Sequence, residues 1–182
     1  MTFGASAFGS SPLGGGPTPL FSANFDLDVS AGNQKIIEVV SYVDRALISH
    51  LSRYPDELRT VNRRFFEELV AELFVGFGYE VELTKRTRDG GKDIIAIKRM
   101  EVNTRFLIEC KRPDPGNPVR LATVRELYGV LSDDKASKAI LATTSHFTSD
   151  AQVFIDKHRW ELEGRDFDAI QSWISDYLNR GR

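Results

Sequence analysis

The chain has 182 residues, of which 41% are hydrophobic and 27% charged, so it can bury one good core with an appendage but not two full domains. The formal net charge of -2 excludes a protein that holds nucleic acid by bulk positive charge alone, so any such site must be a local basic patch. A single cysteine, Cys110, excludes internal disulfides and cysteine-rich zinc clusters. Without a long apolar run or a signal-like start, the sequence predicts a cytoplasmic protein with no membrane contact.

Three segments are predicted along the chain: a flexible leader over residues 1–32, a helical extension over 33–60 and the main domain over 61–182. The leader is rich in Gly, Ser, Ala and Pro, a composition that cannot offset its ordering entropy. It could equally be the remainder of a linker to another domain. Apolar residues recur at three and four positions from Gln34 to Leu51, which predicts an amphipathic helix in the extension.

The first half of the main domain is predicted to be one helix followed by three strands. The helix follows Pro55, carries Glu67 on the edge of its apolar face and ends at Gly76 to Gly78. Alternating residues predict a strand over 79–83, and the double-glycine turn before Asp93 sends the chain back along a second strand. A third strand is predicted over 105–112.

The second half alternates helices and strands. We expect a helix over 119–131, a short buried strand over 139–144 and a helix that starts at Thr148 or Ser149. An extended piece over 161–163 then precedes a last amphipathic helix, with apolar spacing from Phe167 to Tyr177. The expected fold class is α/β, with a mixed sheet flanked by helices.

Two acids and one lysine are predicted to converge on this sheet. Side chains alternate along a strand, so Glu109 and Lys111 share one face while Cys110 points to the other, toward the core. Hairpin pairing brings Asp93 across from Glu109. Taken alone, a Glu-x-Lys pair is usually just solvated and an Asp-Gly-Gly segment is usually just a turn. Their order and spacing together favour a site.

This cluster suits metal-dependent hydrolysis of a phosphodiester. Mg²⁺ prefers oxygen ligands and binds one or two carboxylates plus waters and phosphate. Asp93, Glu109 and the backbone carbonyl of Cys110 are the predicted ligands, with Mn²⁺ as a substitute metal. Lys111 is predicted to orient or deprotonate the attacking water and to neutralise charge on the phosphate.

Asp93 followed after a gap by Glu109-Cys110-Lys111 resembles the motif of the PD-(D/E)XK nucleases, and its surroundings resemble their Mrr-like, type IV-like restriction endonuclease catalytic domain. The resemblance extends from about Phe65 to Tyr177 in the expected order. Residues 66–70 resemble the first-helix signature of the family, and residues 78–79 and 89–93 resemble its first hairpin. Residues 143–145 resemble the end of its fourth strand.

The resemblance implies a restriction-endonuclease-like core of order α-β-β-β-α-β, here with an extra N-terminal helix. It also implies that Glu67 is an accessory catalytic acid near the metal, although an acid at such an edge is commonly only solvated. Cleavage products would carry 5'-phosphate and 3'-hydroxyl ends. This branch often has Gln where Glu109 stands, a departure that leaves the number of metal ions open.

A local basic patch surrounds the predicted site, with eleven Lys or Arg against five acids between Lys85 and Arg125. A charge-rich solvated surface would give a similar count, and phosphate contacts read no bases. The hydroxyl side chains among the candidates could also serve strand-end or helix capping. The candidate nucleic-acid contacts are Arg88, Lys92, Arg112, Arg125, Thr143, Thr144 and Ser145.

The sequence therefore predicts a Mg²⁺-dependent DNA endonuclease with a role in restriction or defence. Two alternatives stay open: a nucleic-acid-binding or partner-recruiting module with restrained or lost cleavage, and a structure-selective nuclease for junctions or repair intermediates. No recognition domain is predicted within this chain, so a recognition domain or partner protein elsewhere and a homodimer also stay open.

Overall fold

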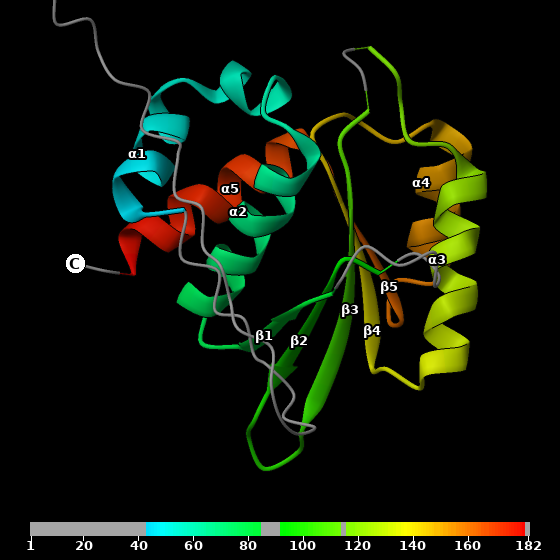
Figure 1. Cartoon of the computed structure of the whole chain (residues 1–182). Helices are drawn as coiled ribbons and strands as arrows, with labels where there is room; N and C mark the ends of the chain where they lie inside the picture. Colours follow the sequence, from blue (N-terminus) through cyan, green and yellow to red (C-terminus); the bar gives the residue numbers. More distant parts are fainter. Residues whose placement is uncertain (1–42, 85–91, 114–115, 181–182) are drawn as a thin grey trace, which may run out of the picture. The chain divides into compact units, whose positions relative to one another are not determined.

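The strands of the sheet lie side by side in the order in which the chain makes them (Figure 1). The computed structural model describes residues 43–84, 92–113 and 116–180, and within these residues the sheet has five strands. The first three strands pair antiparallel, and the third, fourth and fifth pair parallel. The strands are β1 (Glu80–Leu83), β2 (Ile94–Lys98), β3 (Thr104–Lys111), β4 (Lys138–Thr143) and β5 (Leu162–Arg165).

Helices cover both faces of this sheet (Figure 1). On one face lie α1 (Arg45–Arg53), the 3₁₀ turn η1 (Pro55–Arg59), α2 (Arg63–Gly76) and α5 (Phe167–Asn179). On the other face lie α3 (Leu121–Asp134) and α4 (Ser149–Lys157), each of which crosses over between parallel strands. Within the described ranges, no helix is long and apolar enough to cross a bilayer.

Each face of the sheet has its own apolar core. Ile108 and Cys110 of β3 are fully buried in the core beneath α2 and α5. Leu141 of β4 is fully buried in the core beneath α3 and α4. Because β3 lies in the middle of the sheet, its Glu109 side chain is buried as well, whereas Lys111 at the end of the strand stays partly exposed.

The chain caps its helices with short polar side chains. Asp44 accepts a hydrogen bond from the Leu47 N–H at 2.8 Å, and Asn62 does the same for Phe65 at 2.8 Å. The helix predicted over residues 34–51 is therefore wrong at Val43 and Asp44, because the Asp44 cap starts the helix only at Arg45. The earlier part of that prediction lies outside the described residues.

Candidate active site

Asp93 lies at the start of β2, where the strand meets the end of β3. Its N–H donates to the Ile108 carbonyl at 2.9 Å, and its Oδ2 accepts from the Cys110 N–H at 2.7 Å. The register ends with Ile94 opposite Ile108, the residues next to Asp93 and Glu109, and the charge of Asp93 acts on Glu109. The two acids that the sequence singles out are thus neighbours in the sheet.

Glu109 is a buried carboxylate with incomplete partners. Its residue is only 2% exposed, and Oε2 is buried without any hydrogen-bond partner among the described residues. Burial raises the pKa of Glu109; the ion pair with Lys111 opposes this, and the charges of Asp93 and Glu126 add to the rise. This position therefore favours either a proton or a cation.

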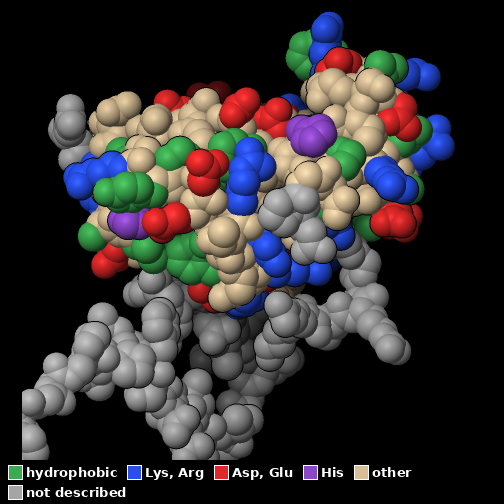
Figure 2. Space-filling model, turned by 90° about the horizontal axis from the view of Figure 1, so that it is seen from above, with side chains coloured by type: hydrophobic (Ala, Val, Ile, Leu, Met, Phe, Trp, Pro, Cys, Tyr) green, Lys and Arg blue, Asp and Glu red, His purple; other side chains and the backbone are tan. Residues whose placement is uncertain are grey.

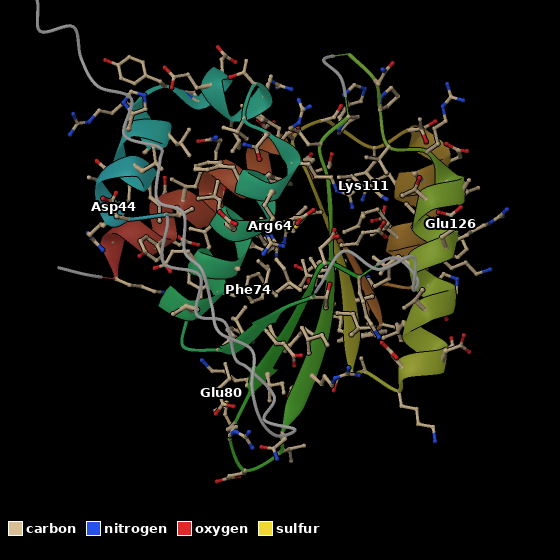
Figure 3. The ribbon with its side chains drawn as sticks, in the orientation of Figure 1. Asp44, Arg64, Phe74, Glu80, Lys111 and Glu126 are labelled. Carbon is tan, nitrogen blue, oxygen red and sulfur yellow. The ribbon has the colours of Figure 1, made fainter. Side chains whose placement is uncertain are left out.

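Lys111 shares the face of Glu109, as strand alternation predicts, and pairs with it. About one third of its side chain remains exposed, so its ammonium group is within reach of solvent. Figure 3 shows Lys111 and Glu126 on the α3 side of β3. Cys110 points to the opposite face and is fully buried, and burial raises the pKa of its thiol, which keeps the thiol protonated.

Glu67 of α2 joins the site through an arginine. Its residue is 2% exposed rather than lying at a solvated edge, because Arg63 and Arg64 both cover it. Arg63 Nε contacts Glu67 Oε1 at 3.0 Å, and Arg63 Nη2 contacts Asp93 Oδ1 at 3.2 Å. Burial alone lowers the pKa of Arg63, but the charges of Asp93 and Glu67 outweigh it and raise that pKa. The three side chains form one chain of opposite charges.

A cationic pocket of about 330 Å³ opens beside these residues. It lies between the end of β3 and the first turn of α3, and its charged lining consists of Arg63, Lys111, Arg112 and Arg120. Figure 2 looks onto this end of the molecule and shows Lys and Arg side chains interspersed with acids rather than one continuous basic surface. The pocket therefore brings four cations together, whereas the rest of this face mixes both signs of charge.

Of the basic residues predicted to contact nucleic acid, Arg112 lines the pocket, whereas Lys92 and Arg125 do not. Arg112 lines the pocket, although its Nη1 also donates to the Arg59 carbonyl at 3.3 Å. Lys92 instead pairs with Asp134 of α3, and Arg125 of α3 lies 5.6 Å from the centre of the Phe154 ring. Arg88 lies outside the described residues.

The hydroxyl residues at the end of β4 are buried. Thr143 Oγ1 accepts a hydrogen bond from the Ser145 N–H at 3.2 Å, and Ser145 Oγ donates to the Asn117 carbonyl at 2.8 Å. Thr144 is 2% exposed, and its carbonyl accepts from Arg59 at 2.9 Å. These hydrogen bonds hold the loops around the pocket, and the contact of the three residues with nucleic acid stays a prediction.

Arg63 and Glu126 are not among the residues that the sequence singles out, and Arg120 is counted in the basic patch but not among the candidate contacts. The spacing of Arg63 and Glu67 on one helix is a signal for an i,i+4 ion pair, which could have pointed to the first of them. The contact of Arg63 with Asp93 joins residues 30 positions apart, and no local pattern encodes it. The places of Arg120 in the pocket and of Glu126 near Glu109 are tertiary in the same way.

The donor set fits a hard divalent cation. Glu109 offers a buried oxygen that no other described residue binds, and Asp93 already holds a cationic group, the guanidinium of Arg63. Carboxylate oxygens are the ligands that Mg²⁺ prefers, and it needs only one or two of them. In the part of the chain that the structure describes, no three His, Cys, Asp or Glu side chains form a ready cage, so water and phosphate would complete the coordination.

Known proteins resemble this chain in sequence and in fold. The sequence profile described as restriction endonuclease (Mrr_cat) matches residues 58–174. Uncharacterized protein y4cE of Sinorhizobium fredii is 31% identical over 132 residues, which are 70% of this chain and 33% of that protein, so the chain spans about a third of that relative.

Two solved structures share the fold. The DNA modification-dependent restriction endonuclease AspBHI is similar with a TM-score of 0.52 at 19% identity, over 84% of this chain and 43% of that one. The restriction endonuclease FokI is similar with a TM-score of 0.52 at 13% identity, over 78% of this chain and 28% of that one.

Proposed function

Because the chain belongs to the restriction endonuclease family, we propose that it is a metal-dependent endonuclease that hydrolyses phosphodiester bonds of DNA. The observation that carries the proposal is the buried Glu109, whose Oε2 has no hydrogen-bond partner among the described residues and which lies near Asp93 and beside Lys111. A buried carboxylate of this kind is unfavourable for folding alone, and such groups cluster at functional sites.

Asp93, Glu109 and the Cys110 carbonyl are the groups that would hold Mg²⁺, or Mn²⁺ in its place. Such a cation would supply Lewis acidity toward the scissile phosphate and activate water. The Cys110 N–H fixes the Asp93 carboxylate, so little reorganisation of that ligand is needed. Lys111 orients the attacking water or takes its proton, and its charge opposes the negative charge that develops on the phosphate.

Glu67 is linked to Asp93 through a shared arginine, Arg63. It is nearly fully buried and reaches Asp93 only through Arg63, so its role in this proposal is that of an accessory acid rather than a direct ligand. As in the nucleases that the motif resembles, hydrolysis would leave 5'-phosphate and 3'-hydroxyl ends.

DNA would meet the chain through its phosphates. The cationic pocket lies beside the acids, and contacts of Arg or Lys with phosphate position the backbone without reading bases. Sequence or methylation specificity would then come from a domain or partner outside this chain, or from a second copy. We assign the activity to restriction or defence by analogy with the family.

A second candidate is a DNA-binding module whose cleavage is restrained. It is favoured by one observation: both acids already have cationic partners, since Asp93 contacts Arg63 and Glu109 contacts Lys111. The same experiment separates this module, a general endonuclease and a structure-selective nuclease.

The experiment incubates the purified chain with plasmid, methylated plasmid and branched DNA, with Mg²⁺ or with EDTA. We expect cleavage only with metal, and a loss of at least about a hundredfold for Asp93→Ala. Glu80→Ala is the matched control, because Glu80 is an exposed acid paired with Arg99 away from the site. Cleavage of branched DNA alone would identify a structure-selective nuclease. Binding without cleavage of any substrate, or cleavage that survives Asp93→Ala, would overturn the proposal.

A further inference from the structure

Two adjacent arginines on α2 differ in one contact. Both Arg63 and Arg64 pair with Glu67, at 3.0 and 3.4 Å. Arg64 otherwise pairs with Glu68 at 3.0 Å on the same helix, whereas Arg63 reaches across to Asp93 of the sheet at 3.2 Å (Arg64 is labelled in Figure 3). Arg63 therefore occupies the oxygen of Asp93 that the Cys110 N–H leaves open.

The exposures of these groups show which partner can move. The side chain of Glu67 is 3% exposed and that of Asp93 15%, while that of Arg63 is 50% exposed. The carboxylates are held by their surroundings, and the guanidinium sits on a long flexible stem at the surface. A cation that binds Asp93 must displace Arg63 rather than pull the acid away.

The Arg63 side chain also borders a second position in which it could bind an anion. It lines the cationic pocket together with Lys111, Arg112 and Arg120. A guanidinium presents parallel N–H donors that match the oxygens of a phosphate, so the pocket offers the released side chain an anionic partner once DNA is present.

We propose that Arg63 exchanges partners: it neutralises Asp93 and Glu67 in the metal-free site, and it moves to a backbone phosphate of DNA in the pocket when a divalent cation takes its place at Asp93. This inference rests on the proposed function, because it takes Asp93 as a metal ligand. It makes Arg63 a competitor of the metal and a contact of the substrate in turn.

The first half of the test is calorimetric titration of the protein with Mn²⁺ in the absence of DNA. Arg63→Gln should bind Mn²⁺ about tenfold more tightly, because a charge-assisted contact no longer competes. Arg64→Gln is the matched control and should stay within about twofold, because Arg64 does not contact Asp93. Arg63→Lys keeps the charge on the helix and should fall between them, which guards against a folding defect in Arg63→Gln.

The second half is fluorescence anisotropy with a labelled duplex, in EDTA and in Ca²⁺, with a gel to check that the duplex stays intact. Arg63→Gln should bind as the unmodified protein does in EDTA and about tenfold more weakly in Ca²⁺. Unchanged Mn²⁺ affinity in Arg63→Gln, or an equal loss of DNA affinity under both conditions, would overturn the exchange.

One further variant separates this inference from the proposed function. Asp93→Asn should lose Mn²⁺ binding if Asp93 is a ligand. If Asp93→Asn binds Mn²⁺ like the unmodified protein, the metal site itself is wrong. If Asp93→Asn loses binding while Arg63→Gln gains none, only the exchange fails.

Discussion

Asp93 and Glu109 lie close together where β2 begins and β3 ends, but their partners differ. Asp93 receives a backbone N–H from Cys110 and a guanidinium contact from Arg63. In the part of the chain that the structure describes, Glu109 pairs only with Lys111, and its buried Oε2 has no hydrogen-bond partner. Burial raises the pKa of Glu109 despite that ion pair, which means that its ionised form is disfavoured in the folded protein.

Glu109→Gln should therefore stabilise the metal-free protein. The amide keeps the shape and removes a disfavoured charge, and Lys111 is exposed enough to be hydrated once it loses its partner. We expect a gain of about 1 kcal/mol in EDTA, measured by thermal melting. Saturating Mn²⁺ should raise the melting temperature of the unmodified protein and leave that of Glu109→Gln nearly unchanged.

Glu80→Gln serves as the control for charge removal in general, since Glu80 is exposed on β1. It should change neither the melting temperature in EDTA nor the response to metal. An equal metal-induced shift in Glu109→Gln and in the unmodified protein would show that Glu109 is not a ligand.

The sequence can predict the shared geometry of Asp93, Glu109 and Lys111, because hairpin pairing and strand alternation are local rules. The predicted facing of Cys110 is confirmed for the same reason. The partners of these groups could not be predicted, because Arg63 and Glu126 reach them from helices that pack only in the folded chain. The roles of the site residues stay predictions.

At the scale of elements, strong periodicity made the fold predictable. The expected order of helices and strands and the mixed sheet of the α/β fold are confirmed, as is the restriction-endonuclease-like core. Element ends were harder to predict, because they depend on caps and bridges. The helix predicted from Val119 starts at Leu121, since Val119 forms a bridge with Phe147.

The packing of α2 against α5 gives a prediction at this scale. A Cβ at Gly76 would lie 2.3 Å from two ring atoms of Tyr177, and Tyr177 is anchored by a 2.7 Å hydrogen bond to Glu72. Gly76→Ala should lower the free energy of unfolding by about 1–3 kcal/mol, because the half-buried Tyr177 ring, held by Glu72, has to shift. Urea denaturation measures this change.

Gly129 of α3 offers the matched control. No atom of the described ranges lies within 4 Å of the Cβ that Gly129→Ala would add, so the substitution should stabilise the protein by about 0.5–1 kcal/mol through helix propensity. Similar effects of the two substitutions would mean that Tyr177 does not pack on Gly76 in solution.

At the scale of the whole molecule, a chain with a net charge of -2 has to bind the proposed substrate, DNA, which is a polyanion. Many surface cations already have acidic partners, as Arg99 has in Glu80. The four cations of the pocket lie together at one end of the sheet, beside the acids. DNA affinity should therefore depend on a few positions rather than on overall charge, and it should fall steeply with salt.

Arg120 tests this view most cleanly, because it is exposed in the pocket and, among the described residues, forms no ion pair with Glu67, Asp93 or Glu109. Arg120→Ala should weaken binding of any duplex and lower the slope of log affinity against log salt by about 1, the value for one lost phosphate contact. Anisotropy titrations in EDTA at several NaCl concentrations measure it. Arg159→Ala is the control, since Arg159 is an equally exposed arginine that lies against Trp160 between α4 and β5. An equal fall of the slope in both variants would mean that DNA is held by diffuse surface charge, and no change in Arg120→Ala would mean that the pocket binds no phosphate.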